Sequence, residues 1–308
     1  MAVGEPRRVL ITGASGFVGR PLLPLLRDAF STAELFAQRF DVTDDNQVVA
    51  AVRETRPDAC IHLAAISTVA QAKQDPDEAW RVNLNGTLHV ARALLRHAPD
   101  CRLVFASSAE IYGSSFAGGQ TLDEGAVLAP MNSYAASKAA ADLALGAMAA
   151  EGLRSIRLRL FNHTGPGQSE AFVVPAFARQ IVLIQSGRQA PPLRVGELAA
   201  SRDFLDVCDV CHAYVACLLH GHELAPDTII NIASGMPRRI GDILQALLDL
   251  AGLRTEVLPD PARMRRSQIP SAIGDNSRAR QLLGWSPRVP WQHTLINVLA
   301  DWRSRLGD

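Results

Sequence analysis

The chain has 308 residues, and its 31 Lys and Arg residues balance its 31 Asp and Glu residues, so the formal net charge is zero. A neutral chain has no overall field to hold a nucleic acid or an anionic membrane, so any anion site must be local. The first residues lead into a strand without a signal-peptide pattern, and no apolar run approaches the roughly 18 residues that span a bilayer. We therefore expect a cytoplasmic protein with a small-molecule partner, and we expect neither nucleic acid nor membrane as a partner.

Short apolar, β-branched runs alternate with longer helical patterns through the first two thirds of the chain. Strands are predicted at 7–12, 33–37, 59–65, 101–107 and 155–161, with helices at 17–29, 44–56, 76–97 and 134–151. Asp44 can cap the second helix, and Asp75 followed by Pro76 is typical of the start of the third. This βαβ alternation predicts an α/β fold of the Rossmann type, with a doubly wound parallel sheet covered on both faces.

The alternation ends after Phe161. Residues 162–200 are rich in Gly and Pro around one helix, residues 227–233 look like a late strand that returns to the sheet, and residues 237–308 are largely helical. The pattern predicts a dinucleotide-binding domain formed by residues 1–161 and about 203–236. Residues of about 162–202 and 237–308 would form a smaller, discontinuous C-terminal substrate lobe.

A glycine-rich turn joins the first predicted strand to the first predicted helix. Its three glycines lie three residues apart, which permits a tight turn and lets backbone N–H groups approach a pyrophosphate at the helix N-terminus. Because strand, helix and further βαβ units are all present, we expect a dinucleotide site here rather than a plain turn. Its expected contacts are Thr12, Gly13, Ser15, Gly16, Phe17, Val18 and Gly19.

The second predicted strand ends without the acidic residue that would bind the ribose hydroxyls of NAD. Arg39 stands there instead and could pair with a 2′-phosphate, which favours NADP(H), with NAD(H) as the alternative and a plain surface charge as the other role of Arg39. We expect Asp41 and Val42 beside the adenine. The remaining predicted cofactor neighbours are Leu63, Ala64 and Ala65, at the end of the third strand, and Asn83, a polar residue in an apolar helix that could instead have a structural partner.

Tyr134 and Lys138 lie four residues apart in the predicted helix 134–151, so their side chains share one face. A cation near a phenol favours the phenolate and would lower the pKa of Tyr134 from about 10, as a general acid or base requires. A surface tyrosine and a solvated lysine at chance spacing are the alternative.

The cysteines include Cys208 and Cys211 before His212, a spacing that matches covalent haem attachment. Haem attachment belongs to exported proteins, and no second Cys/His pair stands at zinc-site spacing. We therefore expect no metal and interpret the cysteines as structural thiols.

The motifs T-G-x-x-G-x-x-G, Ser108 and Y-x-x-x-K occur in the order that is typical of extended short-chain dehydrogenases/reductases, and the chain resembles this family over essentially its whole length. The segments FNHTGPGQ (161–168), SRDFLDVCDV (201–210) and DPARMRR (260–266) are similar to the branch that acts on GDP-activated 6-deoxysugars.

The resemblance implies reduction of the C4 ketone of GDP-4-keto-6-deoxy-D-mannose to GDP-D-rhamnose. Tyr134 would give the proton to the C4 oxygen, Ser108 would hydrogen-bond the same oxygen, and Lys138 would lower the tyrosine pKa and hold the nicotinamide ribose. It also implies a homodimer packed through the helices at 76–97 and 134–151. The residues assigned to the substrate in this way are Asn162, Val173, Arg194, Arg202 and Arg265, and Phe161 is assigned to the cofactor.

A GDP-mannose 4,6-dehydratase is the alternative that the resemblance leaves open, because Glu110 stands where dehydratase relatives carry the carboxylate that removes the C5 proton. Those relatives have a long loop after the second strand, and here that connection is short. A non-catalytic nucleotide-binding protein is a third interpretation, but it has no use for Ser108, Tyr134 and Lys138 together. The product stereochemistry at C4 stays open.

Overall fold

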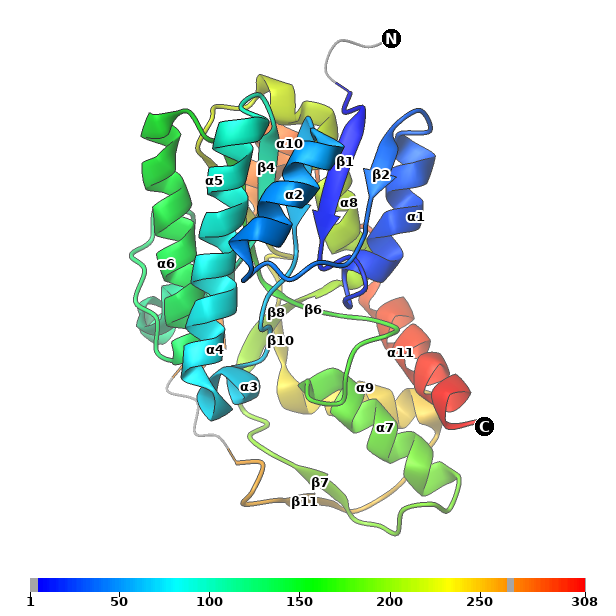
Figure 1. Cartoon of the computed structure of the whole chain (residues 1–308). Coiled ribbons are helices and arrows are strands. Elements are labelled where there is room, and N and C mark those ends of the chain that lie inside the picture. The colour runs from blue at the N-terminus through cyan, green and yellow to red at the C-terminus, as the bar shows by residue number, and fades with distance from the viewer. Residues whose placement is uncertain (1–4, 265–268, 308) are drawn as a thin grey trace.

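A six-stranded, wholly parallel sheet forms the centre of the computed structural model, which describes residues 5–264 and 269–307. The strand order is β2-β1-β3-β4-β5-β9, with neighbouring strands in parallel register. The carboxyl ends of the strands point toward the second lobe (Figure 1). The strands are β1 (Arg8–Thr12), β2 (Glu34–Phe36), β3 (Ala59–His62), β4 (Arg102–Ser108), β5 (Arg154–Leu160) and β9 (Thr228–Ile232).

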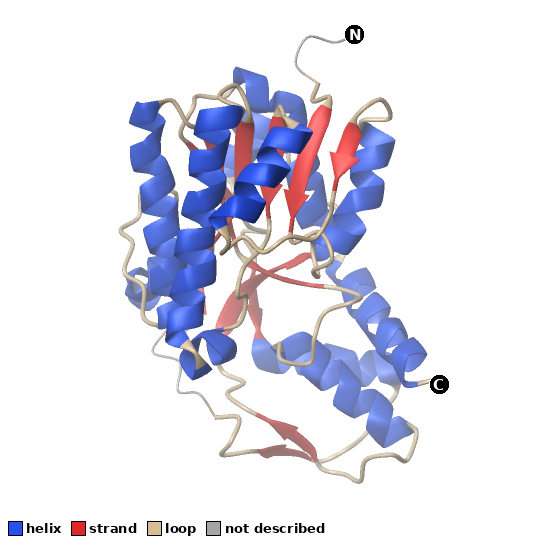
Figure 2. Ribbon diagram, in the orientation of Figure 1, coloured by secondary structure: helices blue, strands red, loops and turns tan. Residues whose placement is uncertain are grey.

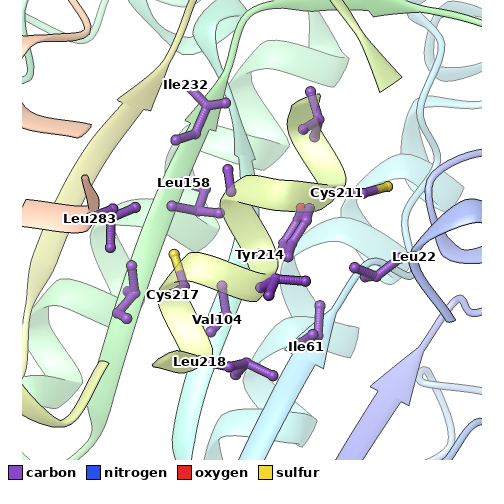
Figure 3. Packing of buried hydrophobic residues seen from close by; sticks show 14 of the residues in the cluster. Leu22, Ile61, Val104, Leu158, Cys211, Tyr214, Cys217, Leu218, Ile232 and Leu283 are labelled. Carbon is purple, nitrogen blue, oxygen red and sulfur yellow. The ribbon is translucent and has the colours of Figure 1, made fainter. Parts of the chain in front are cut away.

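Helices cover both faces of this sheet, which confirms the predicted doubly wound α/β fold. Val9 and Ile11 of β1 contribute to the core on one face, while Leu10 contributes to the core on the other, as strand alternation requires. Figure 3 shows Cys211, Tyr214 and neighbouring side chains of one covering helix packed on the sheet. The first face carries α1 (Gly19–Ala29), α8 (Val207–His220) and α10 (Ser277–Leu283), and the second carries α2 (Asp45–Thr55), α5 (Thr87–His97) and α6 (Ser133–Met148).

Side-chain caps set the starts of several helices where the sequence predicted them. The Asp44 carboxylate accepts backbone N–H groups at the start of α2, and Asp75 accepts the N–H of Glu78 with Pro76 as the first helical residue. Asn132 caps α6 by accepting the N–H of Ala135 at 2.8 Å. The short 3-10 segments are Ala109–Gly118, Ala149–Glu151 and Gly221–Glu223.

The predicted helix at 76–97 is interrupted. It consists of α4 (Pro76–Trp80), a π-helical segment (Arg81–Gly86) and then α5, and it is preceded by an unpredicted short helix, α3 (Val69–Gln74). The π-helical segment holds Asn83 fully buried, where its amide hydrogen-bonds the backbone of Ile66. π-helical turns are rare and frequently mark functional sites.

The second lobe lies at the carboxyl end of the central sheet (Figure 2). Its core is formed by side chains from three helices and two strands, among them Phe177, Leu244 and Trp302. Its helices are α7 (Val173–Gln185), α9 (Ile240–Ala251) and α11 (Trp291–Leu306). Its strands are β6 (Asn162–Thr164), β8 (Ser201–Asp206), β10 (Pro237–Arg239) and β12 (Ser271–Ala272) in one sheet, and β7 (Leu193–Val195) and β11 (Val257–Pro259) as a separate pair.

Part of the segment 237–308 packs on the central sheet rather than within the second lobe. Ala279 and Leu283 of α10, together with Trp285, belong to the core formed by β1, β3, β4, β5 and α8. Conversely, β8, which includes residues 203–206 predicted for the dinucleotide-binding domain, pairs with β6, β10 and β12 in the sheet of the second lobe. The remaining boundaries of the two lobes stay a prediction. Across residues 5–264 and 269–307, no helix is both long enough and apolar enough to span a membrane.

Candidate active site

The glycine-rich turn brings the end of β1 against the end of β3. Gly13 has a φ of +68°, and a Cβ there would lie 2.6 Å from the backbone nitrogen of Ala64. A Cβ on Gly19 would lie 2.4 Å from the carbonyl oxygen of Ala14. Only glycine fits both positions, and α1 begins directly behind them at Gly19. The turn forms a cradle whose shape fits the pyrophosphate of a dinucleotide.

The other predicted residues of this turn line the same cradle. Thr12 is buried, Phe17 and Val18 are partly buried, and Ser15 and Gly16 are exposed at the tip. Gly16 closes the turn by donating its N–H to the Gly13 carbonyl at 2.9 Å.

The segment after β2 carries an exposed arginine and an aspartate that is hydrogen-bonded within the protein. Arg39 is exposed beyond the end of β2. The Asp41 carboxylate accepts the N–H and the hydroxyl of Thr43, at 2.9 and 2.7 Å, and these hydrogen bonds lower the pKa of Asp41. Val42 is buried beside Gly86. Arg39 is therefore exposed at the position where the sequence predicts a contact with a 2′-phosphate.

Asn83 lies beside the segment that follows β3. Its Oδ1 accepts the N–H of Ile66 at 2.8 Å, and its Nδ2 donates to the Ile66 carbonyl at 3.1 Å and to Ser137 Oγ at 3.0 Å. Both amide protons are therefore used within the protein, which gives Asn83 the structural partners that the sequence left as an alternative. Leu63, Ala64 and Ala65 are partly buried at the end of β3.

Ser108, Tyr134 and Glu110 meet at the end of β4 and the start of α6. Ser108 is buried, its Oγ accepts the N–H of Glu110 at 3.2 Å, and its hydroxyl hydrogen-bonds Tyr134. Burial raises the pKa of Tyr134 to about 12, and the bond with Ser108 opposes this shift. Burial also raises the pKa of Glu110, while the Arg202 guanidinium and a hydrogen bond with Asn132 lower it. The phenol is therefore a neutral donor near pH 7.

The expectation that Lys138 lowers the pKa of Tyr134 is wrong for this structure. The Lys138 ammonium lies 4.1 Å from the centre of the Phe105 ring, and burial lowers its own pKa to about 7, although the Asp142 carboxylate raises it. The phenol is shifted upward because desolvation disfavours the phenolate more than its neighbours favour it.

Asp142 lies one helical turn beyond Lys138 and is fully buried. It accepts hydrogen bonds from Ser107 Oγ at 2.6 Å, Arg157 Nη1 at 2.8 Å and Arg159 Nη2 at 3.1 Å. We call these four residues the buried charge cluster. It joins α6 to the ends of β4 and β5, the three elements that carry Lys138, Ser108 and the approach to Phe161. The buried charge cluster was not predicted from the sequence, although Asp142 repeats the four-residue spacing of Tyr134 and Lys138.

The predicted substrate residues are distributed over the second lobe. Arg202 of β8 faces Glu110 closely enough that each side chain shifts the pKa of the other, so the central sheet and the second lobe meet at this pair. Asn162 is exposed on β6, Val173 is the first residue of α7 and partly buried, and Arg194 is exposed on β7.

The Phe161 side chain is buried in an aromatic cluster with Tyr112 and Phe116. Arg265 lies outside the described residues.

The Cys-x-x-Cys-His segment lies on α8. Cys211 is buried with its Sγ 3.6 Å from the Val18 carbonyl oxygen, and burial raises the pKa of both Cys211 and Cys208. All five cysteines are free thiols. Within the described parts of the chain, no three His, Cys, Asp or Glu side chains are grouped so as to hold a metal ion.

The fold and the site together define a dinucleotide-binding enzyme of the extended short-chain dehydrogenase/reductase class. A glycine-rich cradle, the Ser108, Tyr134 and Lys138 group and a second lobe meet at the carboxyl edge of one parallel sheet. In open α/β sheets this edge is where ligands bind.

Comparison with known proteins gives the family. A family model described as GDP-mannose 4,6 dehydratase matches residues 24–297, and the chain belongs to this family. The chain is 37% identical over 305 residues to GDP-6-deoxy-D-mannose reductase of Pseudomonas aeruginosa, which covers 98% of this chain and 99% of that protein. It is 28% identical to GDP-6-deoxy-D-talose 4-dehydrogenase of Aggregatibacter actinomycetemcomitans, covering 90% and 91%. The structure of RMD from Pseudomonas aeruginosa complexed with NADPH is similar, with a TM-score of 0.89 and 35% identity over 97% of this chain and 99% of that one.

Proposed function

We propose that this enzyme reduces the C4 ketone of GDP-4-keto-6-deoxy-D-mannose to GDP-6-deoxy-D-mannose, which is GDP-D-rhamnose. The observation that carries the proposal is the similarity to a GDP-6-deoxy-D-mannose reductase over almost the full length of both chains. We propose NADPH as the preferred cofactor and NADH as the alternative, supported by the exposed Arg39 and by the NADPH complex of a similar structure.

The residues of the site suit a reduction. The glycine cradle and the first turn of α1 would hold the pyrophosphate, and the Gly13 and Gly19 contacts fit that role. When bound, the nicotinamide supplies the hydride to C4. Tyr134 donates its phenolic proton to the C4 oxygen as that oxygen gains negative charge, and Ser108 donates a hydrogen bond to the same atom. A phenol with a pKa of about 12 is almost wholly protonated at neutral pH, which is the state that a proton donor requires.

Lys138 would hold the nicotinamide ribose. Asn162, Arg202 and Arg265 are proposed to bind the substrate diphosphate, since guanidinium groups suit phosphate oxygens bidentately. Val173 and Arg194 are proposed to contact the nucleoside part.

A GDP-mannose 4,6-dehydratase is the second candidate, because Glu110 lies beside Tyr134 and close to Arg202. Elimination needs a carboxylate base at C5, and Glu110 has the position for it. Burial raises the pKa of Glu110, which strengthens the carboxylate as a proton acceptor.

One experiment separates these functions. Purified protein is given either GDP-4-keto-6-deoxy-D-mannose with NADPH or GDP-mannose alone, and nicotinamide absorbance and products are measured. We expect NADPH consumption equal to product formed from the ketone, and we expect the Glu110→Gln variant to keep a substantial part of that rate because reduction breaks no C5–H bond. If wild-type protein instead converts GDP-mannose without net change in absorbance, and Glu110→Gln abolishes this conversion, the enzyme is a dehydratase.

Tyr134→Phe tests the active site itself. It should lower kcat by about a hundredfold or more, because it removes the proton donor. Tyr214→Phe is the matched control, since Tyr214 of α8 is fully buried in the core and its hydroxyl has no hydrogen-bond partner among the described residues. Its activity should be unchanged. Product identification distinguishes GDP-D-rhamnose from its C4 epimer, which a GDP-6-deoxy-D-talose pathway enzyme would form.

We further propose a homodimer through the helices that span 76–97 and 134–151. Trp80 on α4 is 37% exposed and Leu143 on α6 is 58% exposed, although both are large apolar side chains. Leu143→Glu should convert a dimer to a monomer in sedimentation analysis. Ile296→Glu, at a residue of α11 that is 44% exposed, is the matched control and should leave the dimer intact. A monomeric wild-type protein would refute the proposal.

We also propose a cytoplasmic location, supported by the five free thiols, because reducing compartments keep cysteines unpaired. Cell fractionation tests it, and recovery in an oxidising compartment would overturn it.

A further inference from the structure

His62 is a buried histidine that none of the roles above uses. It is the last residue of β3, is 1% exposed, and lies between the end of β1 and the start of α5. Its Nδ1 lies 2.7 Å from Thr12 Oγ1, and its Nε2 lies 3.1 Å from Thr87 Oγ1. Its ring stacks on Phe105 with centres 6.0 Å apart.

The neighbouring hydrogen bonds determine which nitrogen carries the proton. Thr87 donates its single hydroxyl proton to the Asn83 carbonyl at 2.7 Å, so toward His62 it can only accept. His62 Nε2 therefore bears the hydrogen, and Nδ1 is the acceptor. Thr12 Oγ1 accepts the N–H of Ala64 at 3.2 Å and gives its own proton to Nδ1. With this tautomer, each donor between Ala64 and Asn83 has an acceptor.

The ring must stay neutral for this pattern to hold. A proton on Nδ1 would face the Thr12 hydroxyl, whose own proton would lose its acceptor in a buried site. Burial lowers the pKa of His62 to about 3, and the nearby Lys138 ammonium lowers it as well.

The chain of bonds sets the distance between the two backbone segments that form the cradle. Thr12 bonds Ala64 through its hydroxyl, and its carbonyl accepts the N–H of Leu63 at 3.2 Å. These bonds hold Gly13 against Ala64 at a distance that excludes any Cβ. On the other side of the ring, Thr87 bonds the carbonyl of Asn83, whose amide clamps Ile66.

We propose that His62 is a positioning residue that fixes the glycine-rich turn and the segment after β3 at the separation that the dinucleotide requires. This inference rests on the proposed cofactor placement. It extends that placement to a side chain that does not touch the cofactor and acts through Thr12 and Thr87.

Thr87→Val tests the inference with a closely matched control. Thr55 is also fully buried, and its hydroxyl donates to the carbonyl four residues earlier, at 2.7 Å from Ala51, as that of Thr87 donates to Asn83. Thr55→Val therefore removes the same kind of helical hydrogen bond from α2, but it leaves the contacts of His62 unchanged. We measure the NADPH dissociation constant by fluorescence titration and the unfolding midpoint for both variants and for wild-type protein.

We expect Thr87→Val to weaken NADPH binding about five- to tenfold, because the donor on His62 loses its acceptor and the ring is no longer held. Thr55→Val should lower stability by a similar amount and leave NADPH affinity within about twofold of wild type, on the same scale of one hydrogen bond. Equal NADPH affinities for the two variants would show that His62 has a structural role only, and would overturn the inference.

Nitrogen-15 NMR of the histidine ring gives a readout that does not depend on the cofactor. We expect the Nε2–H form of His62 in wild-type protein down to pH 5, and loss of this single form in Thr87→Val. A protonated ring or the Nδ1–H form in wild-type protein at pH 5 would overturn the inference. Wild-type protein that shows the expected tautomer but binds no NADPH would instead contradict the proposed cofactor site.

Discussion

Replacing Asp142 by Asn should destabilise the protein severely, because it removes the only carboxylate that Arg157 and Arg159 share among the described residues. The side chains of these arginines are 5% and 4% exposed, and that of Asp142 is 0% exposed. Breaking a buried ion pair by removing one partner leaves an uncompensated buried charge and typically costs about 3–5 kcal/mol. We expect Asp142→Asn to lower the free energy of unfolding by this amount.

Asp227→Asn is the matched control for this prediction. Asp227 binds the same guanidinium group of Arg157 at 2.7 Å, but its side chain is 38% exposed. Solvent screens such a pair, so the expected loss is about 0–1 kcal/mol. The charge change and the distance to Arg157 are nearly the same in the two variants, whereas Asp142 is fully buried and also pairs with Arg159.

Urea unfolding followed by circular dichroism measures both losses, provided that the dependence on denaturant stays the same in the variants. The total free energy of unfolding of a folded domain is commonly about 5–15 kcal/mol, so Asp142→Asn should still be partly folded in the absence of urea. Losses of equal size for Asp142→Asn and Asp227→Asn would refute the argument from burial.

Three further outcomes follow from the site. Because the pKa of Lys138 is about 7, kcat should fall as pH rises through neutrality. The Asp142 carboxylate raises the pKa of Lys138, so Asp142→Asn should move this fall in kcat to lower pH. An unchanged dependence of kcat on pH in the variant would contradict the prediction. Arg39→Ala should raise the KM for NADPH about tenfold or more and leave that for NADH nearly unchanged, and equal effects on both cofactors would end the assignment. The pKa of His62 is about 3 in the folded protein and 6.5 ordinarily, so between these pH values the unfolded chain binds a proton that the folded protein does not. The stability contributed by neutral His62 is therefore fully present above pH 6.5 and is lost as pH falls toward 3, at about 1.4 kcal/mol per pH unit. In acid unfolding experiments, His62→Gln should lose stability less steeply with falling pH than wild-type protein.

The central sheet and the glycine-rich turn of the site could both be predicted from the sequence. The apolar runs around Val9, Ile61 and Val104 are buried on a parallel sheet, and period-2 and period-3.6 patterns depend only on local residues. The glycine spacing also predicted the tight approach of Gly13, because a motif with fixed spacing encodes its own geometry.

Contacts between distant segments could not be predicted in the same way. Arg157 and Arg159 alternate with Ile156 and Leu158, a pattern that in isolation predicts one buried face and one solvated face. The structure buries both faces, because α6 covers the arginines and supplies Asp142 from 15 and 17 residues earlier in the chain. The expected effect of Lys138 on Tyr134 failed for a related reason: helical spacing gives the direction of side chains but not their desolvation.

The two faces of β5 carry different side chains, apolar on one and charged on the other. Ile156 and Leu158 pack with α8 in an apolar core, whereas Arg157 and Arg159 meet Asp142 under the helix that carries Tyr134 and Lys138. Replacing a buried ion pair by apolar residues of similar volume is often neutral or stabilising, so the charges on this face are not needed for stability as such. They do place a fixed negative charge one helical turn from Lys138, in a low-dielectric setting where that charge acts strongly on the ammonium. Because Asp142 raises the pKa of Lys138, we propose that the charged face of β5 beneath α6 serves to favour the ammonium form of Lys138.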